Sequence, residues 1–344
     1  MSNRISIRKR GHAGLITITR PNVLNAITFE MCMAIKSARE AWRDDPKVAL
    51  ILIEGEGDKA FSAGGDVEEI YRAGLEGDVD FSRNLWRNEY PFLAEIEEYP
   101  KPCVALMDGY VMGLGAGVSM HGSHRVVTER TAFAMPECTI GHIPDTGVSA
   151  RFALAPGSCG KYLGMTGTRL GPADTIHAGL ADCFVRADKI AELREALVAS
   201  GDVGVIEELS SEPPDGELRQ RQAQIDEHFS KSSALEIIRG LEREDDDWAK
   251  ACAKSIRRAS PLSIACFHGV MERVSENPSV RNAVTWEFRY GYRSLSNGDF
   301  MEGVRAQIID KDRQPSWRFA TLEALSPAEV EAMLAPLGPA ELYG

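Results

Sequence analysis

Apolar and polar positions follow two different patterns in the first third of the chain. Residues 5–19 alternate, with a turn from Gly11 to Gly14 in the middle, and this alternation predicts two short strands joined by that turn. Residues 48–53 and most of residues 101–107 form continuous apolar runs instead. Runs of this length are typical of strands buried on both faces, as in a parallel sheet that is covered by helices.

Helical spacing of apolar residues occupies the stretches that adjoin these strands. It predicts one helix over residues 29–44, with Thr28 as its N-cap, because a Thr hydroxyl can accept a hydrogen bond from the first turn. Two further helices are expected near residues 66–75 and over about 81–98.

The balance between strands and helices changes near Asp188. Up to residue 185 the predicted strands and helices alternate, which is typical of an α/β fold with a largely parallel sheet. Beyond Asp188 the pattern is helical, apart from a linker with Pro and Gly at 211–216. We therefore expect a core domain over residues 1–200 and a helical region over residues 201–344.

Composition and charge narrow the classes of protein that fit. The chain has 344 residues, enough for a large buried core, and a net charge of −12 from 39 basic and 51 acidic side chains. This acidic balance argues against a nucleic-acid partner, which needs clustered positive charge. No apolar stretch reaches the length of a membrane span, and the first residues lack the apolar segment of a secretory signal, so we expect a cytoplasmic protein without a membrane partner.

The cysteines indicate neither a metal site nor a disulfide framework. There are seven of them, widely spaced and without a CxxC pair, whereas zinc ribbons and small disulfide-rich domains have close, paired spacings. We expect reduced and mostly buried thiols, and no bound metal.

Two glycine-rich segments, residues 60–67 and residues 109–117, each follow a predicted strand. Glycine at such a position serves either a tight turn or a close approach of the backbone to a ligand. Backbone N–H groups at these turns can stabilise an anion, including the oxyanion that forms when a thioester carbonyl is attacked. The two readings stay open from these residues alone.

A third segment, residues 134–145, places Glu137 and Asp145 among apolar neighbours. Carboxylates in such surroundings are candidates for acid/base chemistry, because burial shifts their proton affinity. The alternative is that they are ordinary capping or loop acids.

Taken together and in this order, the segments resemble the crotonase (enoyl-CoA hydratase/isomerase) superfamily. The resemblance rests on AFSAGGDV (60–67), KPCVALMDGYVMGLGAGVSMHG (101–122), AFAMPECTIGHIPD (132–145), and the later stretches 164–170 and 178–181. Within the superfamily the sequence is most similar to the branch of 3-hydroxyisobutyryl-CoA hydrolases. That narrower likeness is carried by residues 119–137, 260–264, 302–306, 309–312 and 315–317.

The resemblance implies both a fold and an activity. The fold would be a crotonase-like α/β spiral of ββα units, forming an acyl-CoA-binding catalytic core, followed by the helical C-terminal region. The activity would be hydrolysis of a short β-hydroxyacyl-CoA thioester, with 3-hydroxyisobutyryl-CoA of valine degradation as the leading substrate. Coenzyme A is then part of the substrate, no separate cofactor is required, and a homotrimer is a possible assembly.

The resemblance also assigns roles to individual residues. The backbone N–H groups of Gly65 and Leu114 would form the oxyanion hole, and Glu137 and Asp145 would be the catalytic carboxylates. The residues implied in substrate binding are Glu89, Ala63, Gly64 and Asp66. Glu89 has the alternative of being an exposed helix acid.

Two other functions stay open. The first is a hydratase or isomerase of the same superfamily with Glu137 as its only base, but Gly117 stands where hydratases carry a second catalytic Glu. The second is an inactive acyl-CoA-binding protein, which is suggested by departures from the family pattern at Leu114, His142 and Thr146. Retention of both carboxylates argues against that second function.

Overall fold

The computed structural model describes residues 4–343, which divide into two compact units. The sheet unit consists of the segment that ends at Asp66, together with Phe92–Ala134 and Arg169–Arg219. The helical unit consists of Val67–Pro91, Met135–Thr168 and the segment that begins at Gln220. The chain therefore passes between the two units several times, and neither unit is one continuous stretch of sequence.

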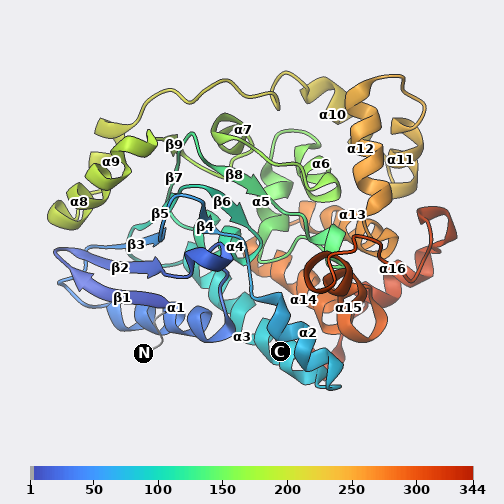
Figure 1. Ribbon diagram of the computed structural model, residues 1–344, viewed down its shortest axis with the longest axis horizontal. Coiled ribbons are helices and arrows are strands. Elements are labelled where there is room, and N and C mark those ends of the chain that lie inside the picture. The colour runs from blue at the N-terminus through green and yellow to red at the C-terminus, as the bar shows by residue number, and fades with distance from the viewer. Residues whose placement is uncertain (1–3, 344) are drawn as a thin grey trace. The chain divides into compact units, whose positions relative to one another are not determined.

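The larger sheet of the sheet unit has six strands in the order β1-β2-β3-β5-β7-β9 (Figure 1). Their bounds are β1 Ile5–Arg10, β2 Ala13–Ile18, β3 Leu50–Gly55, β5 Cys103–Met107, β7 His124–Val127 and β9 Cys183–Phe184. The hairpin of β1 and β2 is antiparallel, whereas the other neighbours are parallel. This is the largely parallel sheet that the alternation of strands and helices predicted.

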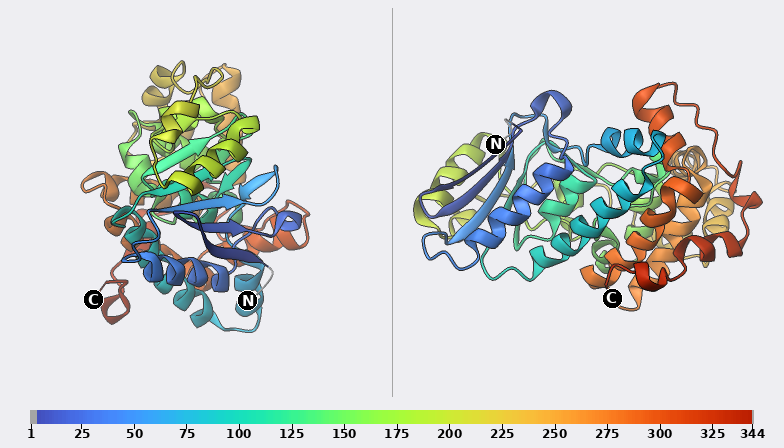
Figure 2. Two further views of the ribbon diagram at one scale, coloured as in Figure 1. Left: turned by 90° about the vertical axis from the view of Figure 1, so that its left-hand side faces the viewer. Right: turned by 90° about the horizontal axis from the view of Figure 1, so that it is seen from below.

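Helices cover both faces of this sheet, which explains the continuous apolar runs. Leu15, Leu52 and Val104 pack on one face against Leu193 and Leu197 of α8 (Ile190–Ser200). The intervening strand positions face the other way, towards α1 (Phe29–Trp42). The right-hand view of Figure 2 shows the blue strands between these two helices. As expected, the Thr28 hydroxyl caps α1 by accepting a hydrogen bond from the N–H of Met31.

The sequence pattern did not predict a second, smaller sheet that the structure contains. It has three strands in the order β4-β6-β8, with bounds β4 Ala60–Ser62, β6 Tyr110–Met112 and β8 Ala132–Ala134. Each of them follows directly on a strand of the large sheet, and this pairing is the ββ part of the expected ββα unit. The sequence pattern predicted only a turn at 109–117, because three residues are too few to show an alternation.

The remaining α-helices of the sheet unit are α4 (Leu114–Met120), α7 (Pro172–His177) and α9 (Val205–Leu209). Within the described residues every named strand ends by Phe184. The prediction of a helical C-terminal region is therefore confirmed.

The helical unit is built around α13 (Pro261–Ser275), which packs against α5 (Val148–Leu154), α6 (Cys159–Thr166), α14 (Val280–Asn297) and α16 (Pro327–Leu334). Its other α-helices are α2 (Val67–Leu75), α3 (Val79–Glu97, whose last turns belong to the sheet unit), α10 (Gln222–Phe229), α11 (Ala234–Leu241), α12 (Asp247–Arg258) and α15 (Phe300–Val304). Ser and Asp hydroxyl or carboxyl groups cap several of them, as at Ser233, Asp246, Ser260 and Ser279. Such caps satisfy N–H groups that have no acceptor within the helix.

All seven cysteines are reduced and six of them are buried, as the spacing predicted. Among residues 4–343, no helix combines the length and the apolar character needed to cross a membrane.

Candidate active site

Gly65 and Leu114, which were predicted to form an oxyanion hole, lie beside one another in the sheet unit, because a Cβ atom on Gly65 would lie 3.9 Å from the Cβ of Leu114. Gly64 and Gly65 follow β4, Leu114 begins α4 after β6, and β4 pairs with β6 in parallel. A Cβ atom on Gly64 would lie 3.8 Å from the backbone N of Leu114. Gly64 and Gly113 have φ values of 116° and 49°, which only glycine adopts without strain.

Backbone hydrogen bonds hold the first of these segments against residues 24–27. The N–H of Ile27 donates to the carbonyl of Gly64 over 2.9 Å, and the N–H of Asp66 donates to the carbonyl of Ile27 over 2.9 Å. The N–H of Ala63 donates to the carbonyl of Leu24, also over 2.9 Å. These bonds fix the direction of the peptide groups from residue 63 to residue 66.

Asp66 has a partner within the protein. Its carboxylate accepts a hydrogen bond of 3.0 Å from the Arg20 guanidinium, which also donates to the carbonyl of Ala26. The Asp66 side chain therefore ties the segment that carries Gly65 to the end of the β2 region.

The three predicted carboxylates lie together in the helical unit. Glu89 is on α3, Glu137 opens the short 3₁₀ helix Glu137–Ile140, and Asp145 precedes α5. Only 4% of Glu89 and 8% of Glu137 and of Asp145 is exposed. The alternative that Glu89 is an exposed helix acid is therefore wrong.

The carboxylates of Asp145 and Glu137 differ in their hydrogen-bond partners. The Tyr90 hydroxyl donates a hydrogen bond of 2.6 Å to the carboxylate of Asp145. The Oε2 atom of Glu137 is buried and has no hydrogen-bond partner among the described residues. An unpaired buried carboxylate oxygen costs free energy and is available to a water molecule or a substrate.

Burial and mutual repulsion raise the proton affinity of the whole cluster. Burial raises the pKa of Glu137 well above its usual range, and the nearby charge of Asp145 raises it further. The pKa of Glu89 is raised in the same way by burial and by Asp145. Burial also raises the pKa of Asp145, although the Tyr90 hydroxyl and the His142 ring oppose that shift. Because like charges this close repel one another, each carboxyl group of the cluster binds its proton more strongly than it would alone.

Sequence analysis missed one member of the cluster, Glu287 on α14. Its carboxylate is fully buried and accepts hydrogen bonds from the backbone N–H groups of Gly147 (2.7 Å) and Ser149 (3.2 Å). Burial and the charge of Asp145 raise the pKa of Glu287 to about 8. Nothing near Glu287 in the sequence separates it from an ordinary helix acid.

His142 and Thr146, the two expected departures from the family pattern, lie on either side of Asp145. His142 is buried, its Nδ1 bonds to the carbonyl of Ile143 (2.8 Å), and its Nε2 has no partner in the described structure. Its ring lies 5.3 Å from the ring of Trp86 and 5.3 Å from that of Tyr290, measured between centroids. Thr146 takes a left-handed φ of 61°, which is unusual for a β-branched residue.

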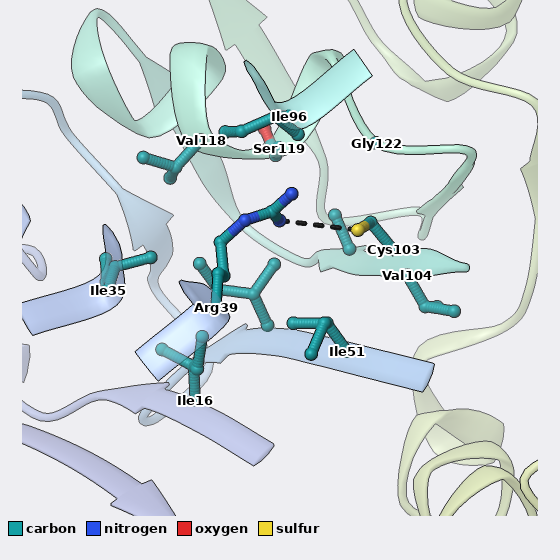
Figure 3. A pocket seen from close by; sticks show the side chains of 12 residues that line it. Ile16, Ile35, Arg39, Ile51, Ile96, Cys103, Val104, Val118, Ser119 and Gly122 are labelled. Carbon is teal, nitrogen blue, oxygen red and sulfur yellow. Dashed lines mark hydrogen bonds between the residues drawn. The ribbon is translucent and has the colours of Figure 1, made fainter. Parts of the chain in front are cut away.

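A small buried cavity in the sheet unit is structural. Figure 3 shows the Arg39 guanidinium inside it, donating to the Cys103 sulfur over 3.3 Å and surrounded mainly by apolar side chains. The cavity measures about 10 Å³, which is the lower limit for one water molecule. It cannot hold an acyl group. No group of three or more His, Cys, Asp or Glu side chains in residues 4–343 is arranged to hold a metal ion.

The family model for enoyl-CoA hydratase/isomerase matches residues 13–334, nearly the whole chain. Together with the two sheets and the glycine turns, this shows that the chain belongs to the enoyl-CoA hydratase/isomerase family, the crotonase superfamily.

Individual relatives narrow the comparison. A protein from Gallus gallus named 3-hydroxyisobutyryl-CoA hydrolase, mitochondrial, is 38% identical and spans 98% of this chain and 90% of its own. A crystal structure described as an enoyl-CoA hydratase from Rhodobacter sphaeroides is 42% identical, covers 99% of this chain and 100% of that one, and has a TM-score of 0.96. One described as a carnitinyl-CoA dehydratase from Mycobacterium thermoresistibile is 36% identical, covers 99% and 98%, and has a TM-score of 0.94. The chain is thus similar throughout to enzymes that act on acyl-CoA compounds.

Proposed function

We propose that this protein hydrolyses the thioester bond of a short β-hydroxyacyl-CoA, with 3-hydroxyisobutyryl-CoA as its substrate. The observation that carries the proposal is the buried carboxyl cluster, in which Glu137 has an oxygen without a partner. The name of the Gallus gallus relative supports the choice of substrate. The reaction adds water to the acyl carbon, breaks its bond to sulfur, and releases a free acid of valine degradation and coenzyme A.

In this proposal Glu137 supplies the base or the nucleophile. A carboxylate whose pKa is raised binds a proton more strongly, so it removes one from water more readily. In the general-base route Glu137 takes a proton from the attacking water. In the covalent route Glu137 itself attacks the acyl carbon and forms an anhydride, which water then opens.

Asp145 and the backbone N–H groups complete the proposed chemistry. Asp145, held by Tyr90, orients the water or the β-hydroxyl group of the substrate. In the general-base route, the proton that Glu137 takes from water then passes to the leaving thiolate. The N–H groups of Gly65 and Leu114 stabilise the negative oxygen of the tetrahedral intermediate, a contribution that is worth about 100- to 1,000-fold per donor in other enzymes. Ala63, Gly64, Asp66 and Glu89 would line the substrate path.

A hydratase is the second candidate, because the Rhodobacter sphaeroides structure is described as one. Addition of water across a C=C bond requires two proton transfers, which hydratases of this superfamily divide between two Glu residues. Gly117 stands at the second of these positions and is a buried residue of α4 without a side chain. This absence favours hydrolysis over hydration.

One assay separates the candidates. The protein is incubated with 3-hydroxyisobutyryl-CoA and, separately, with crotonyl-CoA, while free thiol and the absorbance of the conjugated enoyl thioester are both followed. We expect thiol release from the first substrate. Loss of enoyl absorbance without thiol would indicate a hydratase, and no change with either substrate would favour an acyl-CoA-binding protein.

The first variant to test is Glu137→Gln, which keeps the shape of the side chain and removes its basicity. We expect thiol release to fall by about 100- to 10,000-fold, the usual contribution of a general base. Glu276→Gln makes the same chemical change at an exposed position and should leave the rate unchanged. Wild-type activity in Glu137→Gln would contradict the proposed mechanism. Asp145→Asn with wild-type activity would reduce Asp145 to a role in structure or specificity.

The two routes can be distinguished with a single turnover in ¹⁸O-water. An anhydride exposes the carboxyl carbon of Glu137 to water, so label in Glu137 would favour the covalent route. Label only in the product acid would favour the general-base route.

A cytoplasmic location and a homotrimer remain predictions. Cell fractionation would test the location, and analytical ultracentrifugation would test the assembly.

A further inference from the structure

The turn that follows Asp145 is held in a costly conformation. Thr146 has a φ of 61° and Gly147 one of 82°, so two consecutive residues are left-handed. Glycine adopts this conformation freely, but a β-branched residue such as Thr does not. The Thr146 hydroxyl holds the turn locally by donating a hydrogen bond of 2.6 Å to the carbonyl of Asp145, and a contact from elsewhere in the chain stabilises it further.

Glu287 supplies that contact. Its Oε2 accepts a hydrogen bond of 2.7 Å from the N–H of Gly147, and its Oε1 accepts one of 3.2 Å from the N–H of Ser149. Both N–H groups lie at the start of α5, where no acceptor exists within the helix. The N-cap residue is Gly147, which has no side chain to cap the helix itself. A carboxylate 140 residues further along the chain takes over this function.

Asp145 is thus held from two sides within the helical unit. Tyr90 of α3 binds its carboxylate, and Glu287 of α14 binds the backbone two and four residues after it, at Gly147 and Ser149. Tyr90 and Glu287 are also held relative to each other. The ring of Tyr90 packs edge-on against the ring of Phe288, the residue after Glu287, with the ring centroids 6.4 Å apart.

Stability alone is a poor reason for a carboxylate at this position. Glu287 is fully buried, and the charge that affects it most is the negative charge of Asp145. A buried acid beside another acid costs free energy even with two N–H donors. Such a cost is typical of residues that serve a functional site.

We propose that Glu287 is a positioning residue, which holds the turn Asp145–Ser149 so that Asp145 keeps the orientation required for catalysis. The inference rests on the proposed function, in which Asp145 takes part in thioester hydrolysis. Glu287 itself is fully buried and acts through Asp145.

The test compares Glu287→Gln with Glu287→Asp and with the exposed control Glu276→Gln. In Glu287→Gln an NH₂ group replaces one acceptor, so one of the two backbone N–H groups faces a donor. In Glu287→Asp the carboxylate is shorter by one methylene group and both bonds lengthen. We expect kcat for thiol release to fall by about 10- to 100-fold in both variants, with KM changed by less than about 3-fold, because misplacement of a catalytic group has effects of this size.

A double variant shows whether Glu287 acts through Asp145. If it does, Glu287→Gln combined with Asp145→Asn should be no slower than Asp145→Asn alone. A purely structural role would make the two losses multiply, and that result would overturn the proposal.

Amide hydrogen exchange tests the turn without any substrate. In both Glu287 variants the amides of residues 147–149 should exchange faster than in the wild-type protein, whereas Glu276→Gln should not change them. Unchanged exchange in both Glu287 variants overturns the proposal, even if hydrolysis is confirmed. If the wild-type protein releases no thiol but exchange is faster in the Glu287 variants, Glu287 does hold the turn and the proposed function is wrong.

Discussion

At the scale of single residues, the backbone N–H and the side chain of Leu114 have separate roles in the proposed site. It is the first residue of α4, where proline is tolerated because the N–H has no partner within the helix. The proposed oxyanion hole needs that N–H and not the leucine side chain, so the identity of the side chain affects only the shape around it.

This separation predicts opposite outcomes for two substitutions of Leu114. Leu114→Pro removes the donor and should lower kcat for thiol release by about 100-fold or more. Leu114→Gly keeps the donor and should retain kcat to within about 10-fold, allowing for the lost packing of a side chain that is 5% exposed. Thermal unfolding of both variants checks the fold. If Leu114→Pro folds and retains full activity, its N–H is not an oxyanion donor.

At the scale of secondary-structure elements, close packing decides where glycine is required. Gly164 of α6 lies under the ring of Phe267 of α13, and a Cβ there would come within 2.1 Å of the ring carbon Cζ. Gly240 of α11 has room, since a Cβ there would lie 3.5 Å from the His228 ring, an ordinary contact. Both glycines are inside helices, so only tertiary packing distinguishes them.

The same substitution should therefore have opposite signs at these two sites. Alanine gains about 1 kcal/mol over glycine in a helix interior, and Gly240→Ala, in the last turn of α11, should stabilise the protein by up to about that amount. At Gly164 the overlap with Phe267 costs about 1–3 kcal/mol or more, which exceeds the gain in helix propensity. Urea unfolding of Gly164→Ala and Gly240→Ala measures both effects. A stabilised Gly164→Ala would show that α6 and α13 can separate at little cost.

At the scale of the whole molecule, buried and exposed carboxylates impose opposite dependences of stability on pH. Burial raises the pKa of Glu89, Glu137 and Asp145, and it raises that of Glu287 from 4.5 to about 8. The folded state then holds protons that the unfolded state has already lost, so stability falls as pH rises from about 4.5 to about 8. Exposed acids such as Glu323, whose pKa Arg257 lowers to about 2, lose their stabilising effect as pH falls instead.

We therefore expect the free energy of unfolding to be greatest near pH 4.5, where these two opposing ranges meet. Urea unfolding from pH 4 to pH 9 would measure it. Glu287→Gln removes one raised pKa and should make the decline between about pH 5 and pH 8 less steep. An equal slope in both proteins would mean that Glu287 is not protonated in the folded state.

The local sequence by itself determined the strands β1, β2, β3 and β5, the helices α1, α2 and α3, and the glycine turns. These features depend on residues close together in the chain: an apolar run such as 48–53, a cap such as Thr28, and a glycine that permits a turn such as Gly64. The motifs around Glu137 and Asp145 are also local, which is why the family and the candidate carboxylates could be predicted. The short strands β4, β6 and β8 were beyond this reach, because only pairing with distant strands stabilises three-residue segments.

The tertiary structure alone decided which acids are buried and what holds them. Glu89 and Glu287 both look like ordinary helix acids in the sequence, yet both are buried next to Asp145. Glu287 reaches Gly147 only because α14 packs on α5, 140 residues apart in the chain. A pKa depends on desolvation and on neighbouring charges, and both are properties of the assembled core rather than of any segment.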